Sequence, residues 1–118
     1  MKFMLILKAT KDSEAGKMPS EETINAMVKY NQEQAKAGVL LDAAGLYPSS
    51  TGARVNVAKD GKKTVVDGPF TESKELVAGY WLIQAKSIGE AIEWAKRAPT
   101  SAGQEVQIEV RQFIEFEP

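Results

Sequence analysis

The 118-residue sequence contains no histidine and no cysteine. Without cysteine, the chain has neither a disulfide framework nor a thiolate nucleophile. Without histidine, it lacks the commonest general base near neutral pH and the commonest protein ligand of metal ions. Acid–base chemistry would therefore have to use carboxylates, lysine, tyrosine or backbone groups, and we expect no metal site and no cofactor.

The chain also lacks an excess of charge and a long apolar run. Fifteen basic residues stand against sixteen acidic ones, which leaves a formal net charge of −1. Because a nucleic-acid-binding face normally carries a clear basic excess, this balance argues against direct binding of nucleic acid. The N-terminal apolar run, residues 3–7, is far shorter than the roughly 20 residues that span a membrane, and no other segment approaches that length. We therefore expect a cytoplasmic protein with no membrane contact.

The residues that are present predict one domain, residues 1–118, in which strands alternate with helices. Strands are expected over residues 2–8, 39–47, 77–86 and 106–111, and a hairpin over residues 54–66. Asp60-Gly61 between β-branched runs favours a type I′ turn in this hairpin. Residues 11–19 are expected to form a polar loop, and residues 67–76 a structured loop.

Two helices are expected, beginning after the N-cap residues Ser20 and Ser87, the first ending at Gly38. Ser87 and Glu90 form a capping-box pattern. The expected core-facing residues are Ile24, Met27, Val28 and Ala35 on the first helix, and Ile88, Ala91, Ile92 and Ala95 on the second. Trp94 lies off the second stripe, where we expect it to contact the sheet.

This order of elements predicts an α+β fold, a ferredoxin-like antiparallel sheet with both helices on one face. The first strand is apolar on both sides, since Phe3, Leu5 and Leu7 alternate with Met4 and Ile6. Because two helices can cover only one face of the sheet, a second copy of the chain is the economical cover for the other. We therefore expect a homodimer through the open sheet face.

The segment Asp67-Gly68-Pro69-Phe70 carries the strongest family signal. The run from Val66 to Glu75, followed by Gly79-Tyr80, resembles the DGPF branch of the YCII-related family. Further matches extend the resemblance over nearly the whole chain, at residues 37–40, 45–49, 90–91, 94–95 and 99. The resemblance implies the dimeric α+β barrel fold and says little about a reaction.

The resemblance also implies two kinds of activity. Some relatives look like accessories of extracytoplasmic-function sigma factors, which would make a sigma-factor system a partner. Distant relatives resemble small-molecule enzymes, and the better-studied branch is thought to pair a histidine with an aspartate. That pair cannot be carried over, because this chain contains no histidine.

The motif itself is consistent with a rigid corner. Gly68 permits an unusual backbone angle, Pro69 fixes the turn, and Phe70 can pack onto the core. Asp67 can accept loop N–H groups in an Asx-turn. The alternative interpretation gives Asp67 a catalytic role.

The neighbouring charges leave a similar choice open. Lys74, between Glu72 and Glu75, can hold an anionic substrate or act as a base if burial lowers its pKa. The alternative is a solvated cluster of surface charges. The catalytic candidates are therefore Asp67 and Lys74, and the ligand-binding candidates are Glu72, Tyr80, Tyr30 and Arg54. Tyr80 and Trp81 are strand neighbours and point to opposite faces, so that one of them can line a pocket.

The leading interpretation is a homodimeric YCII-related domain with a small-ligand pocket near the Asp67–Phe70 loop and an unknown reaction. A small-molecule enzyme using carboxylate or lysine chemistry is one alternative. A regulatory accessory of a sigma-factor system is another, and a scaffold whose motif is purely structural is the third.

Overall fold

The computed structural model of the chain describes residues 1–72 and 75–116. Its elements are β1 (Lys2–Lys8), α1 (Lys11–Glu14), α2 (Glu21–Lys36), β2 (Leu40–Gly45), the 3-10 turn η1 (Ser49–Thr51), β3 (Ala53–Val57), β4 (Lys63–Asp67), β5 (Val77–Gln84), α3 (Ile88–Lys96) and β6 (Ile108–Gln112). No helix within these residues is long and apolar enough to cross a membrane.

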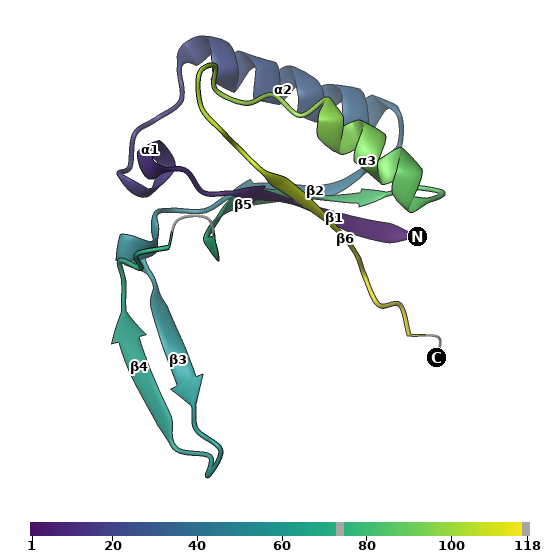
Figure 1. Ribbon diagram of the computed structural model, residues 1–118. Coiled ribbons are helices and arrows are strands. Elements are labelled where there is room, and N and C mark those ends of the chain that lie inside the picture. The colour runs from purple at the N-terminus through teal and green to yellow at the C-terminus, as the bar shows by residue number, and fades with distance from the viewer. Residues whose placement is uncertain (73–74, 117–118) are drawn as a thin grey trace.

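The main sheet has four antiparallel strands in the order β2-β5-β1-β6. Both long helices, α2 and α3, lie over one face of this sheet (Figure 1). This arrangement confirms the ferredoxin-like α+β fold. Strand β1 is central, and its buried residues Phe3 and Leu5 pair with Ile83 and Trp81 of β5.

The expected helix ends are confirmed. The Ser20 hydroxyl accepts a hydrogen bond from the Thr23 N–H group, and the Ser87 hydroxyl accepts one from the Glu90 N–H group. The Glu90 carboxylate reaches back to the N–H group of Lys86 instead of that of Ser87. Gly38 follows the C-cap of α2 with φ of 72°, a left-handed conformation that favours glycine.

Residues 11–19 differ from the expected polar loop, because residues 11–14 form the short helix α1. Thr10 caps this helix: its hydroxyl accepts from the Ser13 N–H group, and the Ser13 hydroxyl accepts from the Thr10 N–H group. This is a capping box in which serine takes the place that glutamate or glutamine usually holds. At the other end of the chain, β6 begins at Ile108, two residues later than the expected strand.

The hairpin is confirmed as β3 and β4, but the expected type I′ turn is wrong. Such a turn needs positive φ at both central residues, whereas Gly61, with φ of 89°, is left-handed and Asp60 is not. The Gly61 N–H group bonds to the Ala58 carbonyl, and the Asp60 carboxylate accepts from the Lys62 N–H group. The hydrogen bond from the Lys62 N–H group to the Asp60 side chain therefore stabilises this turn.

The core-facing sides of the helices also differ from expectation. In α2 the buried residues are Tyr30 and Gln34, whereas the expected core residues Ile24, Val28 and Ala35 are exposed and Met27 is half-buried. In α3 the expected Ala91 is fully buried, but Ile88 and Ile92 are exposed.

Aromatic packing accounts for these orientations. The Tyr30 ring meets the rings of Trp81 and Trp94 edge to face, at centroid distances of 5.3 Å and 6.2 Å. Aromatic side chains bury more area than isoleucine or valine, so the helices turn their aromatic sides inward. Trp94 thereby lies on the packed side of α3 and contacts α2.

The β3–β4 hairpin extends away from the sheet on the side opposite the helices (Figure 1). Every residue of both strands is exposed. A compact domain of this length has a radius of gyration of about 13.5 Å, whereas this chain has one of 16.1 Å. The projecting hairpin accounts for this larger radius of gyration.

Candidate functional site

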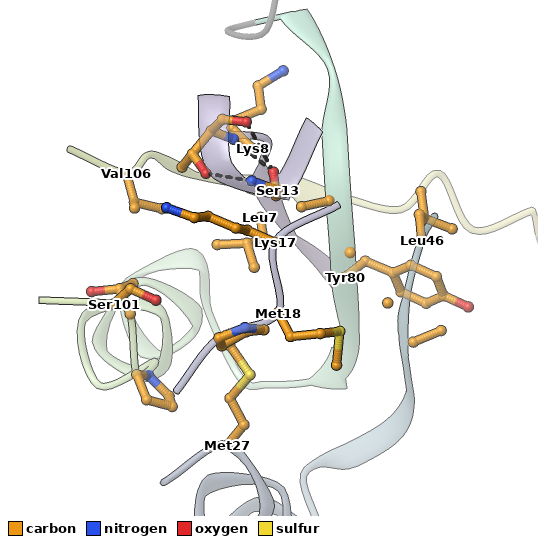
Figure 2. A pocket seen from close by; sticks show the side chains of 18 of the residues that line it. Leu7, Lys8, Ser13, Lys17, Met18, Met27, Leu46, Tyr80, Ser101 and Val106 are labelled. Atoms are coloured by element: carbon orange, nitrogen blue, oxygen red, sulfur yellow. Dashed lines mark hydrogen bonds between the residues drawn. The ribbon is translucent and has the colours of Figure 1, made fainter. Parts of the chain in front are cut away.

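A cavity of about 670 Å³ lies between α2, the sheet and the two segments 10–19 and 99–106. Its apolar wall comes from all of these parts, with Leu7, Met18, Met27, Leu46, Trp81 and Val106 among its members. Figure 2 shows Met18 and Met27 together on one side of this space, with the extended Lys17 side chain crossing above them.

Small residues on the sheet leave room for the cavity. Ala43 and Gly45 of β2 and Gly79 of β5 line it on the face beneath α2. A Cβ atom at Gly79 would lie 2.7 Å from the Ala44 carbonyl oxygen, so only glycine fits at this point of the sheet. Larger side chains at these positions would fill the space that the helix leaves open.

One polar contact is fixed inside this wall. The Trp81 indole N–H group donates a hydrogen bond of 2.7 Å to the Asn31 side-chain oxygen. Trp81 is buried, and Asn31 is half-buried on α2. Because the indole can only donate, this bond fixes which end of the Asn31 amide is the oxygen. The Asn31 NH₂ group is left as an oriented donor at the cavity, and it bonds to no acceptor among residues 1–72 and 75–116.

The charges at the cavity are of one sign. Among the described residues, its lining includes Lys8 and Lys17 and no aspartate or glutamate. The Thr10 and Ser13 hydroxyls, also at its wall, bond to each other's backbone groups in the α1 cap. The part of the chain that the structure describes contains no group of three side chains suited to hold a metal ion.

The two expected ligand-binding tyrosines, Tyr80 and Tyr30, have their hydroxyls bonded to different partners. Tyr80 borders the cavity from β5, but its hydroxyl donates to the Asp42 carboxylate at 3.0 Å, and this bond raises the pKa of Tyr80. Its ring points away from Met18 and Met27 (Figure 2). Tyr30 lies in the core, where its hydroxyl donates to the Trp94 carbonyl at 2.7 Å. Burial raises the pKa of Tyr30 to about 12, against a smaller opposing effect of Arg97.

The Asp67–Phe70 segment forms a corner at the base of the hairpin, with a cis peptide bond between Gly68 and Pro69. A Cβ atom at Gly68 would lie 1.8 Å from the Ser49 carbonyl oxygen, so glycine is required by this close approach. The Phe70 N–H group donates to the Ser49 hydroxyl, which in turn donates to the Glu14 carboxylate. This chain of bonds joins the corner to η1 and α1.

Arg54 completes the corner, with its guanidinium 3.8 Å from the centre of the Phe70 ring. Both residues line a shallow hollow of about 520 Å³, together with Glu14, Tyr47 and Ser49. Segment 46–48 lines both this hollow and the larger cavity.

The remaining expected site residues lie elsewhere. Asp67 and Glu72 are exposed and line neither space, and the Asp67 carboxylate accepts no hydrogen bond from the described residues. Lys74 lies outside the described residues. The structure therefore does not bring the described candidates Asp67, Glu72, Tyr80, Tyr30 and Arg54 together.

Sequence reasoning missed the residues that give the cavity its polarity, Asn31 and Lys17. A signal for Asn31 was present, because it lies four residues after Met27 and therefore on the same face of the helix. A polar amide on an otherwise apolar face indicates either a buried partner or a ligand. Lys17 and Met18 lie in an irregular segment, for which no sequence periodicity indicates a direction.

A family model described as the YCII-related domain matches residues 1–117 of the chain. The chain is also similar to an uncharacterized protein, R00369, of Rhizobium meliloti (strain 1021). The two are 28% identical over 102 residues, which cover 86% of this chain and 82% of that protein.

Proposed function

Because the chain belongs to the YCII-related domain family, whose name indicates no reaction, we propose a function from the site itself. The protein is a homodimer that binds a small molecule in the cavity between α2 and the sheet. The observation that carries this proposal is the oriented Asn31 amide in an apolar wall. Ligand sites combine such walls with a few fixed polar groups, in volumes of roughly 300 to 1,000 Å³.

The Asp67–Phe70 corner supports this site from behind. Segment 46–48 is shared by the cavity and by the hollow that Phe70 lines. The bonds from Phe70 through Ser49 to Glu14 stabilise that segment and α1, which precedes the cavity residues Lys17 and Met18. We place the chain in the DGPF branch on this motif and give the motif a positioning role.

The surface of the chain supports the homodimer. A compact monomer of 12.9 kDa exposes about 6,300 Å², whereas this chain exposes 8545 Å². An excess of about 2,200 Å² is more than one partner contributes to a standard protein–protein interface, roughly 800 Å². A second copy placed against this surface would bury it.

The face that the second copy would cover is the open side of the sheet. Met4 and Ile6 of β1 and Leu82 of β5 lie on that side by alternation with the buried residues. The hairpin and the C-terminal segment leave the sheet on the same side (Figure 1). Ile114 and Phe116 of that segment are exposed in the single chain.

A ligand screen by thermal denaturation tests the proposed pocket, because a compound that binds the native state raises its melting temperature. Ala43→Leu fills the cavity and should abolish the stabilisation that a bound compound gives. Ala26→Leu, on the exposed side of α2, is the matched control and should keep it. The pocket function is refuted if a broad library stabilises nothing, or stabilises the wild type and Ala43→Leu equally.

Two alternatives stay predictions. An enzyme using carboxylate or lysine chemistry would depend on Asp67 and Lys74, and conversion of a bound ligand that Asp67→Asn abolishes would support it. A regulatory accessory would bind a sigma-factor system, and its test is recovery of a transcription component with the native protein.

A further inference from the structure

Several polar groups at the cavity already have partners within the chain. The Thr10 and Ser13 side chains complete the α1 cap, and the Asn31 oxygen accepts from Trp81. The Gln104 amide nitrogen donates to the Asp12 carboxylate. The Asn31 NH₂ group and the ammonium groups of the two lysines, which can only donate, bond to no other described residue. The Tyr47, Thr100 and Ser101 hydroxyls at the wall have no such bond either, and they can donate or accept. A ligand that matches the Asn31 NH₂ group and the lysines must present an acceptor.

The lysines also lack a counter-charge. The ion pairs between described residues join Lys96 to Glu93, Arg97 to Glu33 and Arg111 to Glu109, and none of them includes Lys8 or Lys17. Of the carboxylates near Lys17 in sequence, Asp12 accepts from Gln104 and Glu14 accepts from Ser49. None of Asp12, Glu14, Glu21 and Glu22 lines the cavity. A negative charge on the ligand would therefore meet two cations and no carboxylate at the cavity wall.

The rest of the wall is apolar and adaptable. Met18 and Met27 lie together at one side of the cavity (Figure 2), and Leu7, Leu46 and Trp81 contribute further apolar surface. Methionine side chains are flexible and polarizable, so such a wall accepts apolar groups of different shape.

We infer that the ligand is a small apolar carboxylic acid, with its carboxylate at Lys17 and the Asn31 NH₂ group and its apolar body against the two methionines. This inference rests on the proposed binding function and adds the class of ligand to it. The Trp81 bond positions the Asn31 amide before the ligand enters, which lowers the cost of ordering the site.

Calorimetric titration of matched pairs tests the inference: decanoate with decanamide, and 2-naphthoate with 2-naphthamide. Each pair shares its apolar body and differs in charge. At low salt each acid should bind about tenfold more tightly than its amide, or better, because a hydrogen bond to a charged group is the stronger one. The difference should shrink as salt is added.

Substitutions of Lys17 then test whether this residue binds the carboxylate of the ligand. Lys17→Met should reduce the preference for the acids, because it should weaken their binding more than that of the amides. Lys17→Arg should keep the preference. Lys29→Met, at an exposed α2 position outside the cavity lining, is the control and should also keep it.

Asn31→Asp gives a second, independent test, because aspartate still accepts the Trp81 N–H group but places a negative charge at the site. This variant should weaken binding of the acids far more than binding of the amides. Melting of each variant shows whether it is folded.

The outcomes separate the two proposals. Amides that bind as tightly as the acids would overturn the inferred ligand class and leave the binding pocket in place. If none of the four probes binds, the ligand class is likewise overturned, and the library screen with Ala43→Leu decides independently whether the cavity binds small molecules at all.

Discussion

Gln34 is fully buried in α2, and neither its side-chain oxygen nor its nitrogen has a hydrogen-bond partner among the described residues. A buried polar group without a partner costs about 1–3 kcal/mol. Gln34→Met keeps the length of the side chain and removes both polar atoms. We expect it to raise the free energy of unfolding by about that amount, as measured by urea denaturation.

The control for this prediction is Gln32→Met, at an exposed position of the same helix. It should change the free energy of unfolding by less than about 0.5 kcal/mol. A destabilised Gln34→Met variant would show that the amide binds something inside the protein.

Gly68 carries a second prediction at the residue scale. Gly68→Ala places a methyl group 1.8 Å from the Ser49 carbonyl oxygen, which lies in the backbone and can yield only if the corner moves. We expect the free energy of unfolding to fall by about 2–4 kcal/mol. Gly52→Ala is the matched control, because the nearest atom to its Cβ would be 3.6 Å away. Equal melting of the two variants would contradict the close packing of the corner.

At the scale of elements, the strands and the helix ends could be predicted because they depend on local signals. Ser20, Ser87 and Gly38 cap the helices through their own side chains or backbone conformation. The helix faces were not predictable in this way. The helical spacing of apolar residues predicts an apolar stripe on each helix. The contacts of Tyr30 with Trp81 and Trp94, which join three elements, decide instead which side of each helix faces the core.

Tyr30 also links α2 to α3 through its bond to the Trp94 carbonyl. Its pKa is about 12 in the folded protein and about 10 in an unfolded chain. Below pH 10 the phenol is neutral in both states, so its contribution to stability is complete. Between pH 10 and pH 12 only the unfolded state ionises, and stability should fall by about 2–3 kcal/mol.

Tyr30→Phe isolates this effect, because lysines also titrate in the same range. The difference in unfolding free energy between wild type and Tyr30→Phe should decrease as the pH rises from 10 to 12. A difference that stays constant over this range would contradict the burial of the phenol.

At the scale of the whole molecule, the sequence predicted the sheet, the two-helix layer and the family. The cavity could not be predicted, because its residues come from five separate stretches, 7–19, 27–31, 43–48, 78–81 and 99–106. The cavity depends on small residues such as Gly79 as well as on its polar residues. The expected catalytic residues, Asp67 and Lys74, lie in or near the motif in sequence, and the motif forms the corner behind the cavity wall.

The homodimer makes a prediction at this scale. Val55 and Val65 face each other across the hairpin and are exposed by 60% and 67% in the single chain. An isolated two-stranded hairpin is at best marginally stable in water, so we expect a second copy to contact it. Light scattering should give twice the 12.9 kDa of one chain for the wild type.

The variant Val55→Lys/Val65→Lys should give the mass of one chain, because charge is costly to bury at an interface. Val28→Lys, at an exposed position on the outer side of α2, should leave the dimer intact. A wild-type protein with the mass of a single chain would refute the homodimer.

The most direct test of the binding site is the NMR signal of the Trp81 indole N–H group, which lies at the cavity and bonds to Asn31. Trp94, which does not line the cavity, supplies an internal reference, and Trp94→Phe assigns the two signals. On titration with 2-naphthoate, the Trp81 signal should move and saturate, while the Trp94 signal moves much less. A Trp81 signal that stays in place while the Arg54 signals move would put the ligand in the hollow at the Phe70 corner and contradict the account.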